Sequence, residues 1–168
     1  MYNDKDENGN IKNYKAFKNA SSVLTTNMKK LKKPNVYSYK CDIYPTKLDI
    51  MFDINHIDFM NDTYGWMEDP KAEFIADDSD NYGSTYDLLY NKNDDCKTVL
   101  VVFDGIPNPP QMAHEAFHVM NGIFKDVDLE FNCSKHTGNE HLAYIIEWAV
   151  KCMCDAIEKE KKCKKKTK

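Results

Sequence analysis

The feature that most constrains this chain is the segment His114-Glu115-Ala116-Phe117-His118, which follows the pattern H-E-x-x-H. Positions i and i+4 lie about one turn apart on the same face of a helix. On a helix, His114 and His118 can therefore direct two imidazole nitrogens at one ion, roughly 2 Å from each. Glu115 projects to one side of the first histidine, where it is better placed to take a proton from water than to bind the ion. The pattern predicts a helix that holds a metal ion.

Apolar residues recur at helical spacing throughout this segment. One stripe is Ala113, Phe117, Met120 and Phe124, with Ala116, Val119 and Ile123 beside it. Proline is tolerated in a first helical turn, so the run Ile106-Pro-Asn-Pro-Pro110 can lead directly into the helix, and Gly122 is available to end or bend it. We therefore expect a mostly buried helix, in which polar groups need partners and a metal ion supplies one.

The residues before this helix predict a small sheet. Thr98–Phe103 is apolar on both faces, which predicts a central strand beneath a helix. The connections between the later strands are short and rich in turn formers, which favours antiparallel neighbours. The predicted strands are 36–44, 48–53, 72–77, 85–90 and 97–104, with a short helix at 55–64. The acidic residues Asp77, Asp78 and Asp80 lack the spacing of a calcium loop and are interpreted as a solvated turn.

The two ends of the chain have different characters. An apolar stripe predicts a second long helix from near Asn139 to about Glu158, followed by a basic tail, 159–168, that is expected to fray. Residues 1–12 are polar, and 3-4 spacing predicts a helix over 13–32. That helix is either solvated and loosely packed, or a docking helix for a partner protein or a second copy of the chain. The expected organisation is an arm at 1–33, a domain at 34–158 and the tail.

Composition excludes several classes of function. The chain has 168 residues, enough for one domain, and its net charge of −4 gives no electrostatic case for nucleic acid as the main partner. No apolar run approaches the roughly 20 residues of a membrane span, and the polar N-terminus has no signal core, which predicts a cytoplasmic protein. The six cysteines include no C-x-x-C pair, so free thiols are expected, with Cys133 a minor candidate near the metal.

A catalytic zinc site needs a third protein ligand. The pattern H-E-x-x-H-x-x-G-x-x-H is excluded, because position 121 is Asn and position 124 is Phe. The other arrangement takes a glutamate from the next helix. Glu140 opens the second predicted helix, 22 positions after His118, and is the candidate.

With Asn139-Glu140 in place, the sequence resembles the gluzincins, in which H-E-x-x-H is followed by N-E on the next helix. More narrowly, it is similar to a small set of zinc metallopeptidase-like proteins of bacteriophages and gut bacteria, with A-H-E-x-x-H followed by E-x-x-A-Y-x-x-x-W, here Glu140 to Trp148. The resemblance implies an α+β, zincin-like fold: a small antiparallel or mixed sheet packed on the active-site helix and a second C-terminal helix. It implies one zinc ion bound by His114, His118 and Glu140, with Glu115 as general base, in a bacterial or phage-infected cell.

The sequence departs from the thermolysin-like pattern in two ways. Those enzymes carry an Asp one turn after the third ligand, where this chain has Tyr144, and they have a large C-terminal domain that supplies further catalytic groups. Candidates to stabilise the transition state are Tyr144 and His136, then His141 and Tyr86. His56 is interpreted as structural, and Glu147 as a partner of the ligands or an ordinary salt bridge.

The expected function is a zinc-dependent hydrolase, above all a peptidase, that activates water with zinc and a glutamate base. Its substrate would be a peptide or protein, which could add as a strand to an exposed sheet edge above the motif helix. The alternative is a catalytically inactive zinc-binding domain that serves as a protein-interaction module.

Overall fold

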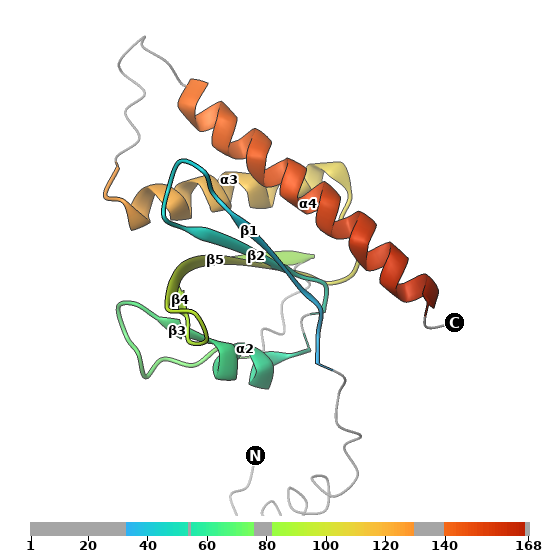
Figure 1. The fold of residues 1–168 in the computed structure, drawn as a ribbon, viewed down its shortest axis with the longest axis horizontal. Helices are drawn as coiled ribbons and strands as arrows, with labels where there is room; N and C mark the ends of the chain where they lie inside the picture. The colour runs from blue at the N-terminus through green and yellow to red at the C-terminus, as the bar shows by residue number, and fades with distance from the viewer. Residues whose placement is uncertain (1–32, 54, 76–81, 130–139, 167–168) are drawn as a thin grey trace, which may run out of the picture. The chain divides into compact units, whose positions relative to one another are not determined.

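The computed structural model describes residues 33–53, 55–75, 82–129 and 140–166. These residues form a mixed α+β fold in which a five-stranded sheet is packed between helices (Figure 1). The strands are β1 (Val36–Lys40), β2 (Lys47–Met51), β3 (Tyr64–Trp66), β4 (Gly83–Asn91) and β5 (Cys96–Phe103). The helices are α2 (Ile57–Thr63), α3 (Pro109–Asp126) and α4 (Glu140–Lys166).

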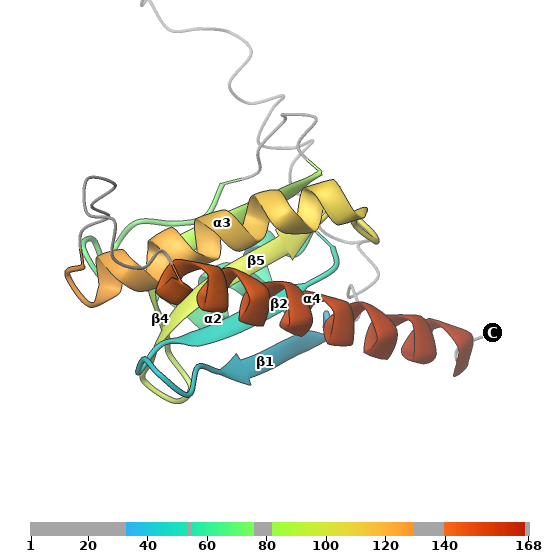
Figure 2. The same cartoon turned by 90° about the horizontal axis from the view of Figure 1, so that it is seen from above.

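The sheet has the strand order β1-β2-β5-β4-β3, so β5 is the central strand. β2 runs parallel to β5, and the other neighbouring pairs are antiparallel. Helices α3 and α4 lie on one face of the sheet and α2 lies on the other (Figure 1). Seen from above, α3 runs along β5 and β4, and α4 passes beside it toward β1 and β2 (Figure 2). The expectation of a central, doubly covered strand before the motif helix is confirmed.

Each face of the sheet carries its own core, because successive side chains of a strand point to opposite faces. On β2, Leu48 and Ile50 belong to the core beneath α3 and α4, whereas Met51 belongs to the core on the α2 side. Asp49 shares the α2 side and is fully buried, where it accepts a hydrogen bond from the Tyr64 hydroxyl at 2.9 Å.

Helix α3 is fixed at both ends by polar contacts. At the start, the Asn108 side chain accepts from the Gln111 backbone N–H and the Gln111 side chain accepts from that of Asn108, a capping box that also suits the prolines at the first two helical positions. At the end, the Asp126 carboxylate accepts a hydrogen bond from the Thr46 hydroxyl and pairs with Lys97 at 2.9 Å. The helix is thus held in register along the sheet.

Gly122 does not end or bend α3, as the sequence suggested it might be free to do. The helix continues to Asp126, and Gly122 faces the sheet. A Cβ at this position would lie 2.7 Å from the Cβ of Asp87 on β4 and 3.3 Å from Val99 on β5. The glycine therefore serves a close approach between α3 and β4.

Three tyrosines connect α4 to the edge of the sheet formed by β1. Two of them belong to β1, and the third lies in the turn that follows it. The Tyr37 hydroxyl donates to Glu160 at 2.9 Å, and the Tyr39 hydroxyl donates to Asp155 at 2.7 Å. Burial, together with the adjacent carboxylate, raises the pKa of both phenols above their ordinary value. Tyr44, in the turn after β1, makes a hydrogen bond with His141 of α4.

Several predicted elements differ from those observed. The strand expected at 72–77 is wrong over 72–75, which is irregular, and the short β3 that follows α2 directly was missed. The basic tail does not fray at Glu158, because α4 continues to Lys166 with ion pairs between successive turns. The helix expected at 13–32 and the acidic residues at 77–80 lie outside the described residues.

Among the helices that the structure describes, none combines the length and the apolar composition needed to cross a bilayer.

Candidate metal centre

His114 and His118 converge on the surface of α3 as the H-E-x-x-H spacing predicts. Their Nε2 atoms are 3.2 Å apart, and their ring centroids are separated by 4.8 Å. Two nitrogens that each lie about 2.0–2.1 Å from one tetrahedral zinc ion are about 3.3–3.4 Å apart. The pair therefore already has the separation of two zinc ligands, and imidazole nitrogen is a donor that zinc accepts.

The two histidines lie on the exposed face of α3. The buried face consists of Glu115, Ala116, Val119, Met120, Gly122, Ile123 and Phe124. Phe117 was expected in the buried stripe, but its side chain is 54% exposed and its ring contacts that of His118. The predicted buried stripe was too wide, because the sheet and α4 cover only one side of α3.

Glu115 points to the opposite side of the helix surface from Phe117, toward strand β4. Its residue exposure is only 6%, and its Oε2 accepts a hydrogen bond from the Thr85 hydroxyl at 2.5 Å. A buried carboxylate without a partner is costly, and this contact satisfies part of its hydrogen-bonding capacity. The glutamate of the motif is consequently held between the histidine pair and β4.

The last residues of strand β4 pair with strand β3. β3 pairs with Leu89 to Asn91, and Met67 extends the contact by donating to the Leu88 carbonyl at 2.8 Å. Thr85, whose hydroxyl contacts Glu115, lies in the same strand, closer to its start.

Strand β4 contains an irregularity between two stretches that pair regularly with β5. The register with β5 shifts between Tyr86 and Leu89, and Leu88 has a φ of 52°. Positive φ is costly for a branched side chain and is retained where the surroundings impose it. Here the bulge separates the end of β4 that pairs with β3 from the stretch that contains Thr85.

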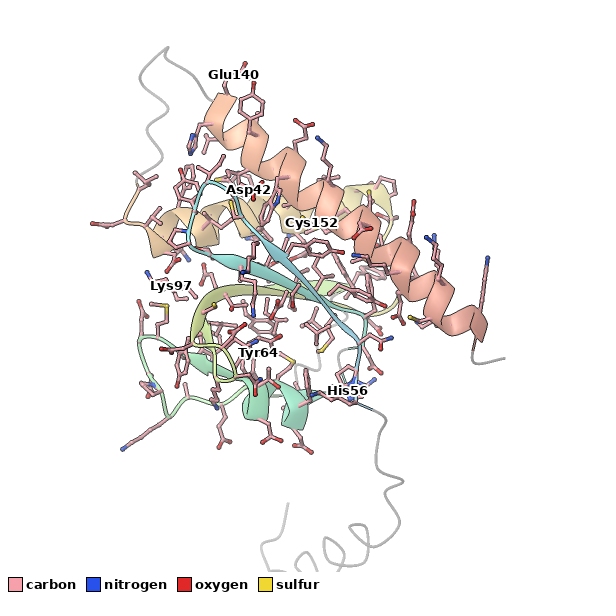
Figure 3. The ribbon with its side chains drawn as sticks, in the orientation of Figure 1. Asp42, His56, Tyr64, Lys97, Glu140 and Cys152 are labelled. Carbon is pink, nitrogen blue, oxygen red and sulfur yellow. The ribbon has the colours of Figure 1, made fainter. Side chains whose placement is uncertain are left out.

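The third ligand is not gathered with the pair. Over the parts of the chain that the structure describes, no group of three or more His, Cys, Asp and Glu side chains lies close enough to hold a metal ion. Glu140 is the exposed first residue of α4 and stands at the outer end of that helix (Figure 3). Cys133 and His136 belong to the connection 130–139, which is outside the described residues. The assignment of Glu140 as a ligand stays a prediction.

The remaining candidates occupy other positions. Tyr144 is 60% exposed on α4, whereas the Tyr86 ring packs against Trp66 and Phe74 in the core on the α2 side of the sheet. His141 contacts Tyr44 and Phe124. Tyr86 therefore does not face the histidine pair.

Two residues interpreted as structural have structural partners. His56 lies beside α2, far from the start of α4 (Figure 3), and its Nε2 is 3.2 Å from the Asp53 carboxylate. Glu147 forms an ordinary ion pair with Lys151 at 2.6 Å. Each residue thus has an ordinary ion-pair partner in the structure.

Thr85 was missed as part of the site. A threonine in a strand does not stand out in a sequence. The only hint was that a strand with an alternating pattern precedes the motif helix. Its contact with Glu115 depends on the register between β4 and α3, which no local pattern specifies.

Comparison of the chain with models of known protein families, with curated proteins and with solved structures gave no match.

Proposed function

We propose that this protein is a zinc-dependent hydrolase that cleaves peptide bonds. The observation that carries the proposal is the convergence of the His114 and His118 nitrogens at 3.2 Å, with the motif glutamate hydrogen-bonded to Thr85 of strand β4. Chance arrangements rarely combine the motif, its helix and a buried carboxylate beside it.

The proposed fold family is that of the zincins. Its support is a mixed sheet with the motif helix packed on one face and a second long helix beside it. We further propose a substrate in extended conformation, because a peptide strand added to a sheet edge can form main-chain hydrogen bonds with it. Peptides and unfolded protein segments meet that requirement.

The residues of the site divide the chemistry between them. His114 and His118 would hold the ion, with Glu140 proposed as the third ligand. A bound zinc ion supplies Lewis acidity, which polarises a carbonyl and makes water a nucleophile near neutral pH. Glu115 takes the proton of the attacking water and returns it to the departing amine. In the structure the Glu115 carboxylate accepts a hydrogen bond from the Thr85 hydroxyl.

The test compares wild type with Glu115→Gln, which keeps the shape of the side chain but removes the base. Peptide-library cleavage and bound zinc are measured on both proteins, with Glu147→Gln as the control because that carboxylate is paired on the surface of α4. We expect cleavage by wild type and the control only, and zinc bound by all three. A wild type that binds zinc but cleaves as poorly as Glu115→Gln would disprove catalysis.

A second candidate is a zinc-binding domain that works through protein binding without cleavage. The position of Glu140, exposed and apart from the histidine pair, favours it. Under this alternative, a chelator lowers the melting temperature while no peptide is cut. A stable metal-free protein with zinc-dependent cleavage excludes it.

A further inference from the structure

Thr85 contributes the hydrogen bond that the structure describes between β4 and the motif glutamate. Its hydroxyl donates to Glu115 Oε2 at 2.5 Å. Glu115 as a residue is 6% exposed, so its carboxylate has few alternative partners in water. The orientation of the Glu115 carboxylate therefore depends on a residue from another element.

The alternation of β4 makes this role specific to Thr85. Successive side chains point to opposite faces, and the Tyr86 ring packs with Trp66 and Phe74 on the α2 side. Ser84 shares that opposite face with Tyr86. Thr85 is thus placed on the α3 side of the strand, and a shift of one residue in β4 would take its hydroxyl away from Glu115.

Two neighbouring contacts hold β4 at this distance from α3. Lys125 pairs with Asp87 at 2.6 Å, and Gly122 lets the strand approach the helix so closely that a Cβ would lie 2.7 Å from Asp87. Both contacts lie nearer to the end of α3 than Glu115 does. They fix the strand against the helix, which leaves the Thr85 hydroxyl within hydrogen-bonding distance of the carboxylate.

We propose that Thr85 is a positioning residue for Glu115, which holds the carboxylate in the orientation in which it accepts a proton from water. The inference rests on the proposed hydrolase function. A purely structural role is the competing explanation, because a buried carboxylate needs a partner whether or not it reacts. The two explanations differ in which measured quantity changes when the hydroxyl is removed.

The experiment uses the full chain with Thr85→Val, which keeps the shape of threonine and removes its hydroxyl, and Thr85→Ser, which keeps the hydroxyl. Ser84→Ala is the matched control, because it removes a hydroxyl from the neighbouring residue on the other face of β4. For each protein we measure kcat and KM on a peptide cleaved by wild type, zinc affinity by competition with a chelator, and the melting temperature. Thr85→Ala is the second hydroxyl-free variant in case Thr85→Val does not fold.

Removing residues that orient the groups of a metal site typically costs about 10–100-fold in activity or affinity. For Thr85→Val we expect kcat about tenfold or more below wild type, with KM and zinc affinity within about twofold. Thr85→Ser recovers most of the lost kcat, and Ser84→Ala behaves as wild type.

Three results overturn the proposal: a kcat for Thr85→Val within twofold of wild type, a Thr85→Ser as slow as Thr85→Val, or an equal loss of zinc affinity. In each of these cases the wild type still cleaves, so the proposed function stands without this role for Thr85. A wild type that neither binds zinc nor cleaves any peptide disproves the hydrolase function itself, and the role of Thr85 with it.

Discussion

Gly122→Ala is expected to destabilise the protein, although the same change in an open helix would stabilise it. Gly122 lies within α3 and faces β4. The added Cβ would meet the Cβ of Asp87 at 2.7 Å and a methyl group of Val99 at 3.3 Å. The Asp87 Cβ is bound directly to the strand backbone, so the contact can be relieved only if α3 and β4 move apart.

Two effects of opposite sign decide the magnitude. Alanine is better than glycine in a helix by about 1 kcal/mol. Overpacking a close contact typically costs about 1–3 kcal/mol, and a Cβ–Cβ distance of 2.7 Å places this site toward the upper end. The net loss is therefore about 1–2 kcal/mol, which corresponds to a fall in melting temperature of roughly 3–8 °C for a domain of this size.

The assay is chemical denaturation under reducing conditions, with Asn121 as the control position. Asn121 is exposed on the same helix, so the difference between Asn121→Gly and Asn121→Ala measures the intrinsic preference for alanine. We expect alanine to be favoured at 121 and disfavoured at 122. Equal stabilisation by alanine at both positions would refute the close approach of α3 to β4, and with it the geometry that brings Thr85 to Glu115.

Two further predictions concern stability outside the site. Burial alone would raise the pKa of Glu160, but hydrogen bonds from Asn35, Tyr37 and Lys164 outweigh it and lower the pKa below the ordinary value of 4.5. Because the unfolded state binds the proton more readily, stability present above about pH 4.5 is lost as the pH falls through the folded pKa, and Glu160→Gln should flatten the acid limb of the melting temperature. An acid limb as steep as wild type would contradict this. Gly65→Ala would place a Cβ 2.5 Å from the ring of Tyr90. The half-buried Tyr90 side chain can rotate away, so we expect Gly65→Ala to destabilise the protein less than Gly122→Ala does. An equal or larger loss of stability would contradict this reasoning.

The parts of the fold that follow from local patterns were predictable. Prolines just before an apolar helical stripe marked the start of α3, and the run Thr98–Phe103 marked a buried central strand. The parallel pairing of β2 with β5 follows no short connection and was not visible in the sequence. The three residues of β3, Tyr64–Trp66, are too few to give a periodic signal.

In the candidate site, too, the features set by local spacing were predictable and those set by tertiary packing were not. The spacing of His114 and His118 is a property of one helix, so their convergence was predictable. The exposure of Phe117 and the contact of Thr85 with Glu115 depend on how α3 lies on the sheet, which is set by packing between distant segments. The place of Glu140 depends on the connection 130–139, so the motif alone could not specify it.

The most direct test of the central claim is zinc affinity, measured by competition with a chelator on wild type, His114→Ala, His118→Ala and Glu140→Gln. His56→Gln is the control, because His56 pairs with Asp53 beside α2. The proposed site predicts one zinc ion per wild-type and control chain, and an affinity at least about tenfold weaker in each of the three ligand variants. A wild type that binds no zinc, or histidine variants that bind it as tightly as wild type, would contradict the claim.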